Sequence, residues 1–300
     1  MILILSDKGD QHADRVESIL KKNAAEYSRL NLDIDSVKAI HISSEENSFR
    51  IDTPNCSFST SQIDAVWNRS AYAEKFMGNR QPSGRTNQLW NKKLTGLFSS
   101  LESTKWLNLY HDFYGENQFS QFAISKNIGL KWPSSICTND INFLNSFFET
   151  KKDRIVELMD QGCQKDCTGK CSERLVIQEP ELYSDDYCPF NEAAYKVRCS
   201  VVGKEYFVGR INAILDKSGE LIDANTKKYR EIHPPKSIKL KAIQLMTELD
   251  LTHGVFDFIV TEEGEWFFDS LNPVGQYQWV EDIRGTDISS SIAKWLMMNN

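Results

Sequence analysis

The sequence lacks the apolar segments that would place it in a membrane or mark it for export. None of its apolar runs approaches the roughly 20 residues that span a bilayer. The first run, at residues 2–5, is too short for a signal peptide, and no basic residue precedes it. We therefore expect a cytoplasmic protein without a membrane partner.

An excess of basic charge is also missing. The 35 Lys and Arg residues are outnumbered by 42 Asp and Glu residues, which gives a formal net charge of −7. A surface that binds a phosphate backbone is normally basic. The charge balance therefore argues against a nucleic-acid partner.

The cysteines do not form an even framework. There are seven of them, and without an export signal we interpret them as reduced cytosolic thiols. Cys163, Cys167 and Cys171 are four residues apart, whereas zinc thiolates usually come as C-x-x-C pairs. No fourth ligand is evident, and Thr168-Gly169 opposes a helix. We favour a loop with free or oxidisable thiols, with a zinc or cluster site as the alternative.

The sequence is long enough, and has enough apolar residues, to form two or three lobes. It has 300 residues, 40% of them hydrophobic. Its first part predicts an α/β unit, with a strand at residues 1–5 and a helix at 10–22. Short strands follow at 26–30, 37–42, 48–51 and 65–67. Later helices are expected at 86–101, 115–127, 140–148, 235–248 and 288–298.

A hairpin near the carboxyl end carries the main chemical signal. Residues 255–260 and 265–271 are rich in β-branched and aromatic residues, and Gly264 suits the turn position with positive φ. Counting outward from this turn places Asp257 directly opposite Asp269. Facing carboxylates repel each other, so the pair calls for a cation. With the amide oxygen of Asn272 they form an all-oxygen set that suits Mg²⁺; the alternative is a surface hairpin with two solvated carboxylates.

The same stretch supports a family resemblance. GVFDFIV followed by WFFDSLNPVGQYQWVE resembles the C-terminal metal-binding end of ATP-grasp ligases, and most closely the branch that matures ribosomal peptides, the graspetide (microviridin-type) ligases. In that family an Asp, a Glu or Asp, and an Asn hold the magnesium ions that bridge the ATP phosphates. This chain departs from the usual text by Asp269 for Glu and Tyr277 for Trp.

Other stretches resemble the same family. The β-α-β opening with Trp67-Asn68-Arg69 is similar to its N-terminal domain, although Trp67 is better explained as core. YKVRCSVVGKEYFVGRI predicts a second hairpin, residues 195–202 and 205–211, and matches a family motif at Arg198. Arg210 is expected almost opposite Arg198. The two guanidinium groups suit a polyphosphate or carboxylate, or are solvated surface groups, and Lys196 replaces the motif's Asp.

The resemblance also implies a nucleotide site. Gln178-Glu179 corresponds to the hinge that pairs with the adenine edge, and Asp186 (or Asp185) to the acid that holds the ribose. We count Lys196 with these cofactor-binding residues. Two lysines that usually hold the nucleotide are missing, because Gln118 and Glu157 stand in their places.

The fold implied is α/β of the ATP-grasp type. Its expected parts are an N-terminal pre-ATP-grasp α/β lobe (1–112), a central lobe (113–180) and a C-terminal lobe with the metal site (181–300). The implied cofactors are ATP and Mg²⁺, the implied partner is a precursor peptide with a leader segment, and a homodimer is expected.

The implied reaction is acyl activation of a side-chain carboxylate of the precursor peptide, followed by closure to an ester or amide. Arg198 and Arg210 would face the phosphate. Two alternatives are an amino-acid ligase like the ribosomal-protein glutamate ligases and a non-catalytic ATP-grasp-like protein that binds a peptide or a partner ligase.

Overall fold

The structure is a computed structural model of the chain. It describes residues 1–37, 39–69, 90, 93–94, 96–98, 100–101, 104–109, 118–132, 134–136, 156–158, 193–211, 234–261, 263–278, 280–281 and 287–298.

The N-terminal part is built on a parallel sheet with the strand order β2-β1-β6-β7. The helix α1 returns the chain from β1 to β2, and the Asp10 side chain caps it by accepting hydrogen bonds from the backbone of His12 and Ala13. The bounds are β1 (Ile2–Ser6), α1 (Gln11–Lys22), β2 (Tyr27–Asn31), β6 (Ala65–Asn68) and β7 (Lys105–Leu107).

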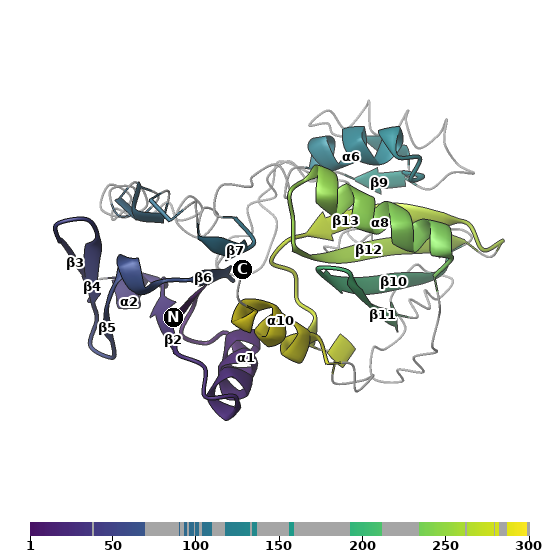
Figure 1. The fold of residues 1–300 in the computed structure, drawn as a ribbon. Coiled ribbons are helices and arrows are strands. Elements are labelled where there is room, and N and C mark those ends of the chain that lie inside the picture. Colours follow the sequence, from purple (N-terminus) through teal and green to yellow (C-terminus); the bar gives the residue numbers. More distant parts are fainter. Residues whose placement is uncertain are drawn as a thin grey trace.

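A small antiparallel sheet, β3-β4-β5, is inserted between β2 and β6 and extends from the body (Figure 1). The prediction of a single strand over 37–42 is wrong here. Residues 34–37 form a short helix, α2, and the strand begins at His41. Asp33 explains the difference, because its carboxylate accepts hydrogen bonds from the Ser36 backbone and hydroxyl and so favours a helical turn. The bounds are α2 (Ile34–Val37), β3 (His41–Ser44), β4 (Phe49–Asp52), β5 (Ser57–Ser59) and the 3-10 turn η1 (Thr60–Gln62).

The C-terminal part is built on an antiparallel sheet with the order β11-β10-β12-β13. The helix α8 covers one of its faces and α6 lies beside α8 (Figure 1). Phe256, Phe258 and Phe268 form the centre of the core under these helices. The bounds are α6 (Gln118–Asn127), β8 (Ser134–Ile136), β9 (Val156–Leu158), β10 (Ala193–Val202), β11 (Glu205–Ile211), α8 (Lys236–Glu248), β12 (His253–Thr261) and β13 (Trp266–Asn272).

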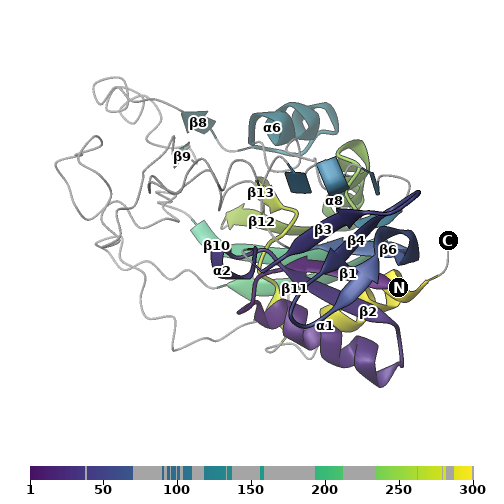
Figure 2. The same ribbon diagram turned by 90° about the vertical axis from the view of Figure 1, so that its left-hand side faces the viewer.

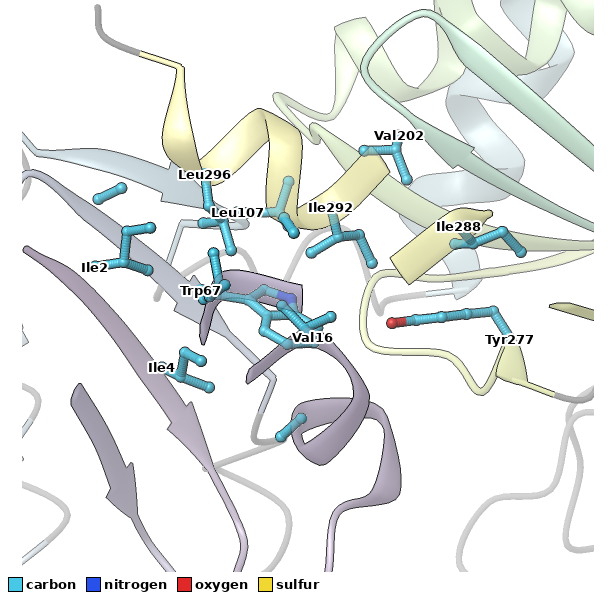
Figure 3. Close-up of a cluster of buried hydrophobic side chains, with 14 of the residues drawn as sticks. Ile2, Ile4, Val16, Trp67, Leu107, Val202, Tyr277, Ile288, Ile292 and Leu296 are labelled. Atoms are coloured by element: carbon cyan, nitrogen blue, oxygen red, sulfur yellow. The ribbon is translucent and has the colours of Figure 1, made fainter. Parts of the chain in front are cut away.

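One buried cluster joins the two parts. The last helix, α10 (Ile288–Met297), packs beside α1 (Figure 1, Figure 2). Trp67 is fully buried in this cluster, as expected of a core residue. Figure 3 shows Trp67 of the N-terminal sheet near the residues of α10, with Tyr277 beside Ile288. The two parts therefore share a hydrophobic core through Ile2, Ile4, Val16, Trp67, Leu107, Val202, Val255, Tyr277, Val280, Ile288, Ile292 and Leu296.

The predicted element types agree with the structure for β1, α1, both C-terminal hairpins, α8 and α10. The proposed domain limits stay predictions. Within the described part of the chain, no helix is both long and apolar enough to cross a membrane.

Candidate functional site

The β12–β13 hairpin contains a β-bulge at the position of the predicted metal ligands. The turn is as expected: Thr261 N–H donates to the Glu265 carbonyl (3.0 Å), and Gly264 has φ +81°. The register then holds as far as Phe258 opposite Phe268, where it shifts by one residue. Ser270 therefore stands opposite Asp257, and the expectation that Asp269 does so directly is wrong. Counting from the turn failed because the bulge adds a residue to β13.

The bulge nevertheless keeps the two carboxylates on one face of the sheet. Phe268 and Leu271 are three residues apart, yet both are buried in the core under α8. A regular strand would turn them to opposite faces. The two residues between them, Asp269 and Ser270, are half-buried and belong to the other face, together with Asp257.

Asn272 belongs to the same face. It stands opposite Val255, which is two residues from Asp257, and its side chain is exposed. Its Oδ1 accepts a hydrogen bond from Val274 N–H (2.9 Å), which orients the carboxamide. Asp257, Asp269 and Asn272 thus line one end of this face.

Arg198 forms a bidentate ion pair with Asp257. Its Nε and Nη2 donate to Oδ1 and Oδ2 at 2.7 and 2.8 Å, and the two side chains are 28% and 20% exposed. The pairing follows from the register, because Arg198 and Asp257 are direct partners on β10 and β12. A planar guanidinium held at both oxygens fixes the orientation of the Asp257 carboxylate.

Arg210 stands one position away from the place directly opposite Arg198. Gly209 stands opposite Arg198, and Arg210 stands opposite Val197. Lys196 pairs with Ile211 on one side and Ile259 on the other. The structure therefore brings Arg198 together with Asp257, and it does not place Arg210 opposite Arg198.

The donor set suits magnesium chemically. Two carboxylates and a carboxamide on one partly exposed face provide the oxygen ligands that Mg²⁺ prefers, with room for waters and substrate phosphates. Among the described residues, no group of three or more His, Cys, Asp and Glu side chains could hold a metal ion. The set formed by Asp257, Asp269 and Asn272 has only two such side chains and gains its third oxygen from an amide.

Most of the predicted nucleotide-binding residues fall on parts that the structure does not describe. Gln178, Glu179 and Asp186 lie outside the described residues, as do Cys163, Cys167 and Cys171. Of the two positions without the usual lysine, Gln118 begins α6, and Glu157 is the middle residue of β9, opposite Ser135.

Sequence reasoning missed Ser270 as a residue of this face, although a signal was present. Ligands on one face of a regular strand are an even number of residues apart. Asp269 and Asn272 are three apart, so a strand that presents both must contain a bulge. That spacing, read with the apolar pair Phe268 and Leu271, predicts the irregularity.

A buried polar cluster supports the far end of the hairpin. His253 opens β12 and is 2% exposed. Burial lowers the pKa of its imidazole to about 4, so the ring is neutral at pH 7. The neutral ring lies 3.2 Å from the Pro273 carbonyl through Nδ1 and 3.4 Å from the Ser200 hydroxyl through Nε2.

Comparison with solved structures shows likeness over the full chain. The macrocyclase MdnC of Microcystis aeruginosa, bound to its precursor peptide MdnA, matches with a TM-score of 0.78 at 16% identity, over 100% of both chains. A ribosomal-peptide-associated ATP-grasp ligase of Chryseobacterium gregarium, in complex with ADP and a leader and core peptide, matches with 0.74 at 20% identity, over 98% of this chain and 96% of that one. The ATP-grasp ligase PsnB, with a minimal precursor, Mg and ADP, matches with 0.71 at 16% identity, over 99% and 96%.

No protein-family model and no curated protein matches the sequence. At these identities the likeness establishes the fold, including the parallel N-terminal sheet and the antiparallel C-terminal one. The chain therefore has the ATP-grasp fold, which it shares with these ligases and with the macrocyclases MdnB and MdnC.

Proposed function

We propose that this protein is an ATP- and Mg²⁺-dependent ligase that cross-links a ribosomal precursor peptide. It activates Asp or Glu side chains of the peptide as acyl phosphates and joins them to Ser or Thr hydroxyls or Lys amines. The products are ester or amide rings, with ADP and phosphate. The precursor is expected to bind through a leader segment.

The observation that carries this proposal is the shared face of Asp257, Asp269 and Asn272 within an ATP-grasp fold. A protein that only kept the fold would gain nothing from two close carboxylates and from a bulge that brings Asn272 onto their face. Solved structures of the same fold contain ADP, Mg and precursor peptides, and that likeness supports the same classes of ligand here.

The chemistry asks the protein to position groups and neutralise charge. A peptide carboxylate oxygen attacks the γ-phosphorus of ATP, the bond to the β,γ-bridging oxygen breaks, and ADP leaves. A hydroxyl or amine then attacks the acyl carbon, loses its proton, and expels phosphate. Magnesium bound by Asp257, Asp269 and Asn272 would supply charge neutralisation at the ATP phosphates.

In this scheme Arg198 has two tasks. It holds the Asp257 carboxylate by both oxygens, and its positive charge on this face is proposed to attract the phosphate or the peptide carboxylate. Arg210 on β11 stays a proposed phosphate contact, although its register partner Val197 belongs to the opposite face of the sheet from Arg198. Gln178, Glu179, Asp186 and Lys196 remain the proposed nucleoside and cofactor contacts.

A second candidate function is non-catalytic binding of a peptide or a partner ligase. The observation that favours it is the pair Gln118 and Glu157. Glu157 occupies the middle of β9, where the family places a cationic contact to ATP, and each lost charge-assisted bond is worth about 1–3 kcal/mol. An amino-acid ligase of the glutamate-ligase type is the other enzymatic reading, and one structure described as a RimK domain protein matches with a TM-score of 0.56.

The decisive experiment is a mass-spectrometric assay on the purified protein. ATP, MgCl₂ and a short peptide encoded beside this gene, rich in Thr or Ser and Asp or Glu, are incubated with the protein. Loss of one water per ring, with ADP formed only in the presence of the peptide, supports the ligase. Calorimetry that detects peptide binding but no Mg²⁺-dependent nucleotide binding would establish the non-catalytic alternative.

A further inference from the structure

The backbone on both sides of Asn272 is held by two buried carboxamide side chains from distant parts of the chain. Asn108 follows β7 of the N-terminal sheet and is 4% exposed, and Gln121 lies on α6 and is 2% exposed. Neither belongs to the face that carries the metal-ligand set. Each contacts a residue adjacent to Asn272.

Asn108 uses its full hydrogen-bonding capacity on the two ends of the hairpin. Its Oδ1 accepts from the backbone N–H groups of Thr252 and His253, both at 2.8 Å. Its Nδ2 donates to the carbonyls of His253 (2.8 Å) and Pro273 (3.2 Å). A carboxamide has two donors and two accepting lone pairs, so Asn108 ties the start of β12 to the residue after Asn272.

Gln121 holds the residue before Asn272. Its Oε1 accepts from Leu271 N–H at 3.0 Å, and its Nε2 donates to the Leu271 carbonyl at 2.6 Å. Among the described residues β13 is the edge strand of its sheet, and edge strands leave backbone groups without a strand partner. Gln121 supplies those bonds where another strand would.

Together these contacts leave little freedom to the segment that presents Asn272. Leu271 is fixed by Gln121 and Pro273 by Asn108, while Arg69 donates to the Val274 carbonyl from the end of β6. The bulge at Asp269 has removed regular pairing on the preceding residues. Side-chain hydrogen bonds from Asn108, Gln121 and Arg69 therefore hold the backbone around Asn272, where regular strand pairing is interrupted or ends.

We propose that Asn108 and Gln121 are positioning residues that hold Leu271 and Pro273 so that the Asn272 carboxamide is presented to Mg²⁺ beside Asp257 and Asp269. The inference rests on the proposed function, because it takes Asn272 as a metal ligand. It assigns to the N-terminal sheet and to α6 a part in setting the metal affinity of a site formed on the C-terminal sheet.

The test uses two substitutions that keep side-chain shape and remove donors. Asn108→Asp loses the bonds that Nδ2 donates to the His253 and Pro273 carbonyls, and Gln121→Glu loses the bond that Nε2 donates to the Leu271 carbonyl. MgCl₂ is titrated into the full-length protein with saturating ADP by calorimetry. We expect each variant to bind Mg²⁺ about tenfold more weakly, as is usual for groups that orient metal ligands, while ADP affinity without metal is unchanged.

A matched control separates positioning from general destabilisation. Ser289→Ala removes a buried hydrogen bond to Glu281 at the start of α10, away from Asn272. This variant is expected to lower Tm and leave the Mg²⁺ affinity unchanged. In an Asn272→Ala background, Gln121→Glu should still lower Tm but should have no further effect on Mg²⁺ binding.

The outcomes distinguish this inference from the proposed function. If the wild type shows no Mg²⁺-dependent ADP binding, the proposed function fails and this inference fails with it. If the wild type binds normally and the variants lose Tm without losing Mg²⁺ affinity, the inference alone is overturned. Should Asn108→Asp not fold, Gln121→Glu and its combination with Asn272→Ala decide the question.

Discussion

The two hairpins of the C-terminal sheet are alike at their turns and different along their strands. Each turn has a glycine at positive φ, Gly203 at +57° and Gly264 at +81°. The β10–β11 hairpin keeps one register over its whole length, whereas β12–β13 gains a residue at Asp269. The regular hairpin contributes Arg198, and the bulged one displays the acidic residues. A break in alternation is therefore what gathers the proposed metal ligands on one face.

Loss of the Asp269 carboxylate from the bulge should have the largest effect on Mg²⁺-dependent ADP binding. Deletion of Asp269 and deletion of Ser270 each restore a regular ladder with Leu271 still in the core. The first leaves a serine opposite Asp257, and the second places Asp269 there. We expect loss of Asp269 to weaken Mg²⁺-dependent ADP binding by about a thousandfold, or about 4 kcal/mol, and loss of Ser270 to retain binding. Calorimetry measures both, and equal affinities for the two deletions would contradict the assigned role of Asp269.

The buried His253 of the bulged hairpin should make the stability of the protein depend on pH, whereas Cys199 and Tyr206 of the regular hairpin should not. The folded-state pKa of His253 is about 4, below the ordinary 6.5, because burial disfavours the charged ring. Its contribution to stability is complete above pH 6.5 and is lost as pH falls toward 4. The shift corresponds to about 3 kcal/mol.

The regular hairpin provides the contrast, because burial raises the pKa of Cys199 to about 12 and also raises that of Tyr206. Neither group titrates between pH 4 and 7.5. Urea unfolding at several pH values should show a smaller loss for His253→Gln than for the wild type. Parallel pH curves would show that other groups cause the acid sensitivity.

The ion pair between Arg198 and Asp257, which joins the two hairpins, should make a smaller contribution, in this case to the free energy of unfolding. Arg198→Lys keeps the charge but loses the paired N–H groups that hold Asp257, and we expect the free energy of unfolding to fall by about 1–2 kcal/mol. Lys131→Gln is the matched control, because the Lys131–Glu265 ion pair at the hairpin turn is about half exposed and such pairs contribute little. Chemical denaturation measures the free energy of unfolding of both variants. Equal losses would show that the Arg198–Asp257 pair contributes no more than an exposed ion pair.

Substitutions of the two turn glycines should have the smallest effects on the free energy of unfolding, and the two effects should be similar. Gly203→Ala and Gly264→Ala are each expected to cost about 1 kcal/mol, because positive φ disfavours a side chain. An added Cβ meets nothing closer than 3.9 Å at Gly203 and nothing within 4 Å at Gly264, so the cost is confined to the backbone. Gly9→Ala, also in open space but without positive φ, should be neutral. A clear difference between the two turns in urea unfolding would contradict this account.

Much of the fold could be predicted from local pattern. The apolar spacing of residues 10–22 and the Asp10 cap specify α1, and the β-branched runs around Gly203 and Gly264 specify both hairpins. Helix α2 was missed because the capping bonds of Asp33 outweigh the strand propensity of Val37. Local bonding of this kind involves few residues and is easily obscured by an apolar run.

The candidate site stays a prediction in its residues, and its geometry was predicted only in part. Asp257, Asp269 and Asn272 were identified as one set, but the facing of the two carboxylates was misplaced by the bulge. Arg210 was expected almost opposite Arg198, and it stands one position away, opposite Val197. Register errors of one residue are costly in a strand, because each one moves a side chain to the other face.

The sequence by itself determined the helices and strands, the turn glycines and the all-oxygen character of the proposed metal site, because these depend on neighbours within a few residues. Only the tertiary structure decided that Arg198 forms an ion pair with Asp257 and that Asp269 is the extra residue of a β-bulge. It also decided that Asn108 and Gln121 hold the backbone around Asn272. Those contacts join residues far apart in the chain. They exist because backbone groups at a bulge and at a sheet edge must find hydrogen-bond partners wherever folding brings them.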